Sequence, residues 1–150
     1  MSGPGPLLAE AAARLRAAGV PSPRVDAELL LAHVLDVARS RLLLVDVGPA
    51  ERSAYETALA RRVAREPLQH IVGWAPFRHL QVPVGPGVFV PRPETELLVD
   101  AVLPALASPE AVAVDLCSGS GALALALADE SPAARVVAVE RPGETFDLWL

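Results

Sequence analysis

A short stretch from residue 115 to residue 121 carries the clearest chemistry in this sequence. It reads Asp-Leu-Cys-Ser-Gly-Ser-Gly, with an acid at one end and two glycines toward the other. Gly119 and Gly121 allow the backbone to pass close to a ligand, where a Cβ atom would clash. Glu140 follows at about the distance along the chain where nucleotide-binding folds place a ribose-binding carboxylate. These residues predict a site for a nucleoside-containing cofactor.

The elements around this stretch predict a strand–turn–helix–strand unit. Residues 112–114 are an apolar run typical of a strand, and 135–139 are a second such run. The alternating Ala and Leu residues of 122–128 favour a helix between them. The N-terminus of that helix is expected to offer free N–H groups to a bound ligand.

Two classes of cofactor compete for this turn. The spacing Gly119-x-Gly121-x-x-Ala124 fits the dinucleotide fingerprint and would make the protein an NAD-type oxidoreductase, but that pattern alone is weakly specific. Asp115, at the start of the turn, suits a cationic ligand better than a pyrophosphate. The arrangement Asp-Leu-x-x-Gly-Ser-Gly resembles motif I of class I S-adenosylmethionine-dependent methyltransferases, which we favour. A generic turn with a capping serine is the interpretation without a ligand.

Composition limits the protein class. The 150 residues are 52% hydrophobic and 21% charged, which is typical of a globular protein. The net charge of −5 and the lack of a basic stripe argue against direct nucleic-acid binding. No apolar run is long enough for a membrane span. The single cysteine excludes an internal disulfide and fits a reducing compartment, so we expect a cytoplasmic protein without a metal site.

The pattern along the chain predicts three parts. Residues 1–66 read as a small all-α helical bundle with helices over 6–18, 23–35, 39–44 and 50–65. Residues 67–92 read as a β-hairpin linker, with strands at 69–73 and 77–80. Residues 93–150 read as an incomplete α/β domain. The arginines near residue 65 are expected to be a solvated helix end or, less favoured, a surface for an acidic partner.

A second informative stretch, residues 87–96, precedes that α/β domain. Pro91 and Pro93 flank Arg92 and should hold its backbone extended. Pro93 also suits the first turn of a helix. We expect the apolar stripe of that helix to consist of Leu97, Leu98, Ala101, Val102 and Ala105, with Pro104 bending or ending it.

Taken together, these segments resemble the HemK/PrmC family of protein N5-glutamine methyltransferases. The likeness rests on Asp-Ala-Glu-Leu-Leu-Leu-Ala-His at 26–33, on Val-Phe-Val-Pro-Arg-Pro-Glu-Thr-Glu at 88–96 and on the turn at 115–121. It implies a helical substrate-docking domain before a Rossmann-like class I methyltransferase domain. It also implies methylation of the glutamine side-chain amide in the Gly-Gly-Gln loop of peptide chain release factors. The cofactor-binding residues that it implies are Asp115, Gly119, Ser120, Gly121, Glu140, Phe89, Arg92 and Thr95.

The sequence departs from this family in one respect. The family polarises its amide substrate with an Asn-Pro-Pro-Tyr loop, and these 150 residues contain no asparagine. We therefore expect a C-terminally truncated chain that has no catalytic residue of its own and no activity alone. A non-catalytic remnant that docks a release factor is the alternative. An incomplete parallel sheet should also leave an exposed edge, which predicts low stability or self-association.

Overall fold

The computed structural model describes residues 3–141. The chain divides between Val72 and Gly73 into two compact units, and each is described by itself. Within residues 3–141, no helix combines the length and apolar character needed to cross a bilayer.

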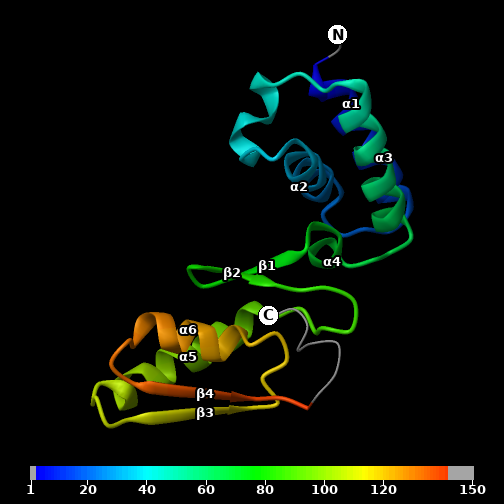
Figure 1. Cartoon of the computed structure of the whole chain (residues 1–150). Coiled ribbons are helices and arrows are strands. Elements are labelled where there is room, and N and C mark those ends of the chain that lie inside the picture. The colour runs from blue at the N-terminus through cyan, green and yellow to red at the C-terminus, as the bar shows by residue number, and fades with distance from the viewer. Residues whose placement is uncertain (1–2, 142–150) are drawn as a thin grey trace. The chain divides into compact units, whose positions relative to one another are not determined.

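The first unit is entirely helical (Figure 1). Its elements are α1 (Pro4–Ala17), α2 (Pro23–Leu35), the 3-10 segment η1 (Arg39–Leu44), α3 (Pro49–Val63) and α4 (Leu68–Val72). The three long helices pack against one another. Each has a proline in its first turn, where the missing backbone N–H removes no helical hydrogen bond. The helical bundle expected from the sequence is therefore present, with boundaries within a few residues.

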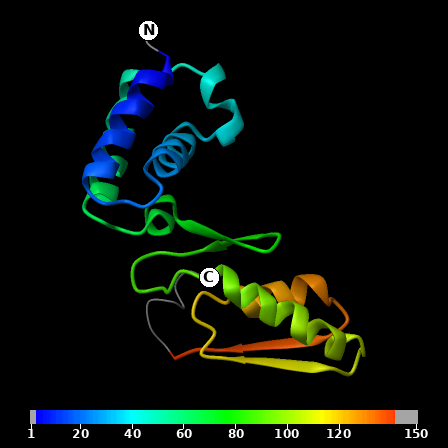
Figure 2. The same ribbon diagram turned by 180° about the vertical axis from the view of Figure 1, so that it is seen from behind.

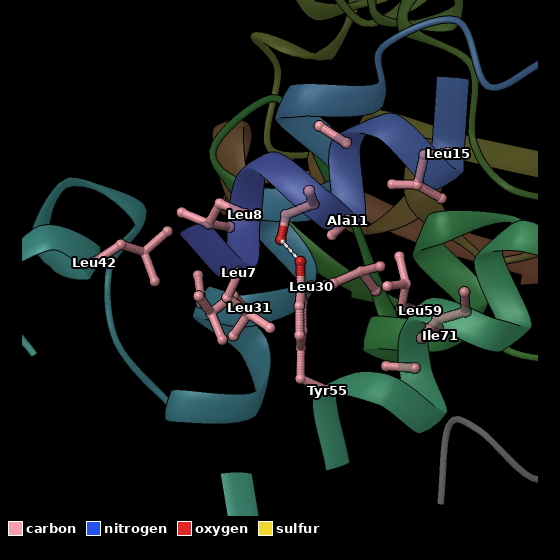
Figure 3. Packing of buried hydrophobic residues seen from close by; sticks show 14 of the residues in the cluster. Leu7, Leu8, Ala11, Leu15, Leu30, Leu31, Leu42, Tyr55, Leu59 and Ile71 are labelled. Atoms are coloured by element: carbon pink, nitrogen blue, oxygen red, sulfur yellow. Dashed lines mark hydrogen bonds between the residues drawn. The ribbon is translucent and has the colours of Figure 1, made fainter. Parts of the chain in front are cut away.

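The core of this unit consists mainly of leucines and alanines and includes one tyrosine (Figure 3). Leu15, Leu30 and Leu59 are fully buried where α1, α2 and α3 meet. Tyr55 is also fully buried, and its hydroxyl donates a hydrogen bond of 3.0 Å to the Ala27 carbonyl on α2. Burial raises the pKa of Tyr55, so this phenol remains a neutral donor. The bond satisfies the polar end of an otherwise apolar side chain.

Of the three arginines at the end of α3, Arg61 and Arg65 are exposed, as expected of a solvated helix end, whereas Arg62 is not. Arg62 pairs with Asp26 of α2 at 2.7 Å, and both side chains are nearly buried. Arg65 has a left-handed backbone, and its guanidinium donates to the Ala18 and Gly19 carbonyls just after α1. Arg61 pairs with Glu66 at 2.5 Å. Arg62 and Arg65 thus join the end of α3 to α2 and to the residues after α1, whereas Arg61 pairs locally.

The expected first strand at residues 69–73 is wrong. Leu68–Val72 is the short helix α4, whose Ile71 is buried against the bundle. The amide N–H groups of His70 and Ile71 donate to the Pro67 carbonyl. The β-branched residues here favour a strand locally, but packing against the bundle determines the outcome.

The second unit begins with the hairpin, displaced from its expected register. Strand β1 (Trp74–Phe77) pairs antiparallel with β2 (Leu80–Pro83), and Phe77 faces Leu80 across the turn. Arg78 in that turn has a left-handed φ of 51°. Its guanidinium binds the carboxylates of Glu130 and, at 2.9 Å, Asp100. The backbone N–H of Arg78 donates to the Glu96 carboxylate at 3.0 Å. This one side chain fastens the hairpin to two helices of the same unit.

The remaining elements form a small α/β layer. They are η2 (Pro93–Thr95), α5 (Glu96–Val102), η3 (Leu103–Leu106), β3 (Val112–Leu116), α6 (Ala122–Glu130) and β4 (Arg135–Val139). Strands β3 and β4 pair in parallel, with Val114 opposite Val137. In both views α5 and α6 lie on the same side of the strand pair (Figures 1 and 2). The described residues hold this single parallel pair, and a larger Rossmann-like sheet stays a prediction.

Helix α5 buries a different face from the expected one. The buried and half-buried apolar residues of α5 and η3 together follow the helical spacing i, i+3, i+4, i+7 and are Val99, Val102, Leu103 and Leu106, of which Val102 alone was expected in the stripe. Leu97 and Leu98, expected in the core, are 69% and 51% exposed. The segment is apolar on two faces, so periodicity alone could not identify the packed one. The helix does change to 3-10 geometry around Pro104, as expected.

The strand pair has one uncovered apolar face. Val112, Val114 and Leu116 of β3 are 59%, 55% and 70% exposed, and Val139 of β4 is 46% exposed. The opposite face of β3, which includes Ala113, packs into the core with α6. Parallel sheets are normally covered on both faces. The bare face, defined as Val112, Val114, Leu116 and Val139, is therefore an unusual exposure of apolar surface.

The nearly buried ion pair of the first unit predicts a measurable loss of stability. Asp26→Ala leaves the Arg62 guanidinium without its carboxylate and should lower the free energy of unfolding by about 2–3 kcal/mol. Glu56→Ala breaks the exposed Arg14–Glu56 pair and should cost about 0.5 kcal/mol or less. Urea unfolding followed by far-ultraviolet circular dichroism measures both. Equal losses would show that burial of the first pair is unimportant.

The bare face predicts self-association with a second copy of this chain. Sedimentation velocity over a range of concentrations should reveal association, and Val112→Thr with Val114→Thr should reduce it, because Thr keeps strand propensity while removing apolar surface. Leu43→Thr with Leu44→Thr, on exposed leucines of the helical unit, is the matched control. A wild-type monomer with a cooperative melt at high temperature would contradict the prediction.

Candidate functional site

The turn after β3 is held in an unusual backbone shape by β4. Three of its residues are left-handed: Cys117 with φ 61°, Gly119 with φ 55° and Gly121 with φ 73°. The N–H groups of Cys117 and Ser118 both donate to the Val139 carbonyl, at 2.8 and 3.2 Å. These bonds fix the turn against the strand that neighbours β3.

Gly119 is a position in this turn where a ligand can approach the backbone closely. A Cβ atom built there meets no other atom within 4 Å, so open space lies beside it. Its left-handed φ also disfavours any side chain. Gly121 caps α6, and its N–H donates to the Ser118 carbonyl at 2.8 Å.

A cavity of about 350 Å³ opens beside this turn. It gathers six of the eight residues that the sequence singled out: Phe89, Arg92, Thr95, Asp115, Gly119 and Ser120. Two segments that are separate in sequence, 89–95 and 115–123, thus line one space. Gly121 and Glu140 are not among the lining residues. Sequence reasoning missed Pro91, Cys117, Ser118, Ala122 and Leu123, which also line it.

Two buried polar atoms at this cavity have no hydrogen-bond partner among the described residues. They are Oδ2 of Asp115 and Oγ of Ser118. Burial raises the pKa of the Asp115 carboxyl, the nearby Glu140 charge adds to the rise, and a bond from the Ala124 N–H partly offsets it. A buried carboxylate oxygen without a partner, next to open space, favours a cationic or N–H-donating ligand.

The other wall of the cavity is the proline-flanked segment, residues 89–95. Arg92 is extended, with φ −92° and ψ 138°, as its two prolines predicted. Its guanidinium carbon lies 5.5 Å from the centre of the Phe89 ring, a cation–π contact. The Arg92 carbonyl accepts a bond of 3.0 Å from the Thr95 N–H, which starts η2. The segment therefore presents an aromatic ring and a cation to the cavity.

Glu140 acts on the turn itself. One carboxylate oxygen accepts a bond of 2.7 Å from the Gly119 N–H, and the other accepts one of 2.8 Å from the Arg141 N–H. The bond from Gly119, followed by that from Arg141, lowers the pKa of Glu140, so the group is ionised at neutral pH. A ribose-binding role for this residue stays a prediction, since each oxygen can accept a further bond.

The described residues offer no metal centre. Within residues 3–141, no three His, Cys, Asp or Glu side chains gather closely enough to hold a metal ion. His33 and His79 are exposed. The chemistry of the cavity is thus that of a polar turn, a carboxylate and an arginine.

Comparison with known proteins gives a consistent result. Residues 6–73 match the family model described as the PrmC N-terminal domain. The chain is 56% identical over 131 residues to the release factor glutamine methyltransferase of Mycolicibacterium smegmatis, covering 87% of this chain and 47% of that protein. It is 54% identical over 136 residues to the Streptomyces coelicolor protein of the same name, covering 89% and 48%. The chain spans about half the length of the curated relatives it matches.

The raised pKa of Asp115 predicts that this residue opposes folding. Because the folded protein holds the proton more tightly than the unfolded chain, stability falls as pH rises through the interval between the two pKa values. Asp115→Asn should therefore melt at a higher temperature than wild type at neutral pH, and the difference should vanish in acid. Thermal unfolding at a series of pH values tests this, with Asp129→Asn on the exposed side of α6 as the control. A destabilised Asp115→Asn protein at neutral pH would refute it.

Proposed function

This chain belongs to the PrmC family over the residues that it spans, and we propose that it carries the docking domain and cofactor site of a release factor glutamine methyltransferase. The reaction class is transfer of a methyl group from S-adenosylmethionine to the side-chain amide nitrogen of glutamine in the Gly-Gly-Gln loop of a release factor. The relatives' shared name supports the class of enzyme and of substrate.

One observation supports the cofactor most directly: the half-buried Asp115 carboxylate, whose Oδ2 has no partner among the described residues, lies beside open space at Gly119. S-adenosylmethionine supplies an electrophilic methyl group on a cationic sulfonium, and its amino-acid tail carries an ammonium group. Asp115 would accept hydrogen bonds from that ammonium group. A dinucleotide would instead bring a pyrophosphate toward an unneutralised carboxylate, which is unfavourable.

The other residues take roles that follow from their positions. Gly119 and Gly121 give the methionine part of the cofactor access to the backbone, and Ser120 lines the same wall. Glu140 holds the turn and has acceptor capacity left for ribose hydroxyls. Phe89 and Thr95, on the opposite wall, would shield the cofactor from water.

The amide substrate sets a further requirement. An amide nitrogen is a poor nucleophile because its lone pair is delocalised, so an enzyme must align it and polarise its carbonyl group. The family uses an Asn-Pro-Pro-Tyr loop for this, and these 150 residues contain no asparagine. We therefore propose that this polypeptide binds the cofactor but does not transfer the methyl group by itself.

The helical unit is proposed as the release factor docking domain. A cavity of about 540 Å³ lies between α1, α2 and η1, lined by Leu8, Arg24, Glu28, Arg39, Ser40, Leu42 and Leu43. Leu43 and the adjacent Leu44 are 73% and 80% exposed. Exposed leucines beside a cavity with charged walls are the kind of surface that binds a protein partner.

Calorimetric titration tests the cofactor assignment. The chain should bind S-adenosylmethionine and its demethylated product S-adenosylhomocysteine, and should not bind NAD. Asp115→Asn should weaken S-adenosylhomocysteine binding by about tenfold or more, because a charge-assisted contact is lost. Asp129→Asn should leave it unchanged. Binding of NAD in preference to both adenosyl ligands would reject the proposal in favour of an oxidoreductase.

A transfer assay separates the enzyme from a docking module. With labelled S-adenosylmethionine and a release factor, the chain alone should transfer no label, whereas the full-length Mycolicibacterium smegmatis relative serves as the positive control. Retained release factor binding without cofactor binding would favour the non-catalytic module. Transfer by the chain alone would contradict the proposed need for the Asn-Pro-Pro-Tyr loop.

A further inference from the structure

An arginine outside the cavity of the second unit bonds to both helices that begin at the cavity walls. The guanidinium of Arg78, in the hairpin turn, donates two bonds to the Glu130 carboxylate at the end of α6, one of them at 2.7 Å. It also donates to the Asp100 carboxylate of α5 at 2.9 Å, and the Arg78 backbone N–H donates to the Glu96 carboxylate at 3.0 Å. The side chains of Arg78 and Glu130 are 16% and 17% exposed, so water and salt screen their attraction less than at an open surface.

The three carboxylates depend on this arginine to lie together. Glu96, Asp100 and Glu130 all bond to Arg78, and negative charges gathered in this way repel one another when no cation lies between them. The bond from Arg78 lowers the pKa of Glu130, so that carboxylate is ionised at neutral pH. Arg78 thus holds α5 and α6 together at a point where their acidic side chains alone would drive them apart.

Both helices begin at a wall of the cavity. Helix α5 starts directly after Thr95, which lines one wall, and α6 starts with Ala122 and Leu123, which line the other. Helix α6 has nine residues and is therefore a rigid rod about 13 Å long, so a change in its angle at Glu130 moves its first turn. The contact at Arg78 therefore influences the separation of the two walls.

We propose that Arg78 is a positioning residue for the cofactor cavity: by joining α5 to α6, it fixes the distance between the wall at residues 89–95 and the wall at residues 115–123. Arg78 is not among the residues that line the cavity. Its loss should widen the cavity without removing any group that contacts the ligand. This inference rests on the proposed function and adds to it a residue that determines cofactor affinity from outside the cavity.

A double-mutant cycle in the full chain measures this coupling. In calorimetric titrations at a temperature where every variant is folded, Arg78→Gln and Glu130→Gln should each weaken S-adenosylhomocysteine binding by about five- to tenfold. The double variant should weaken it by no more than the larger single effect, because both changes break the same contact. Arg78→Lys should recover part of the affinity, because it keeps the charge but loses the two-pronged bond to Glu130.

The separation of the walls can be measured without a ligand. In a Cys117→Ser chain, Glu94→Cys and Leu125→Cys place nitroxide labels on exposed positions of the first wall segment and of α6. Pulsed electron spin resonance should give a narrow distance distribution when Arg78 is present. For Arg78→Gln the distribution should be broader and shifted to a longer distance.

The controls separate a positioning role from general stability and from failure of the proposed function. Val102→Ala removes apolar packing from α5 and changes no charge, so it should lower the melting temperature and leave the affinity and the label distances unchanged. Equal effects of Val102→Ala and Arg78→Gln would overturn the inference. So would an Arg78→Gln chain with unchanged label distances, or with unchanged affinity where the wild type binds. If the wild type binds no adenosyl ligand, the proposed function fails, and the label distances still decide whether Arg78 positions the walls.

Discussion

The second unit depends on the bond from the Gly119 N–H to the Glu140 carboxylate, together with the two bonds to the Val139 carbonyl. These three contacts join the end of β4 to the turn after β3. They hold a backbone with three left-handed residues, one of which, Cys117, is not a glycine. Without them, the relaxed turn would move Asp115 and the start of α6 relative to each other, and the cavity would lose its shape.

The features that make the site useful oppose folding. Asp115 keeps a half-buried carboxylate with one oxygen unpartnered among the described residues, and Cys117 keeps a backbone conformation that side chains disfavour. The uncovered apolar face of β3 adds a further liability. The helical unit also has left-handed non-glycine residues and exposed leucines, but its core is leucine-rich, its buried tyrosine is hydrogen-bonded and its nearly buried Arg62 is paired. The second unit thus carries features at its cavity that reduce stability, whereas the helical unit has a core whose buried polar groups are satisfied.

The sequence predicted the parts of this structure that are governed by local rules. The glycine turn, the extended Arg92 and the prolines at helix starts follow from backbone preferences of single residues. Three features depend on distant partners and could not be predicted. Leu68–Val72 is helical because Ile71 packs on the bundle, α5 has two apolar faces, and Arg78 meets Glu130, which lies 52 residues further along the chain.

The same division holds for the site. The polar turn and the proline-flanked segment were identifiable one at a time, and their meeting in one cavity required the fold. Glu140 was identified by its distance along the chain, but its bond to Gly119 depends on the register of β3 and β4. Ser118 was visible only as one polar residue among several, and burial distinguishes it.

The small apolar cluster under the segment that carries Phe89 has a consequence for binding thermodynamics. Val84 and Val88 pack with Ala75 of the hairpin, and the Val84 N–H bonds to the Gly73 carbonyl at 3.0 Å. Arg78 clamps that hairpin to α5 and α6. The segment that carries Phe89 is therefore ordered before any ligand binds, so ligand binding should cost little conformational entropy for ordering this side of the cavity. A rigid segment of this kind favours slow dissociation of a ligand that fits and makes the cavity less able to adapt to ligands of different shape.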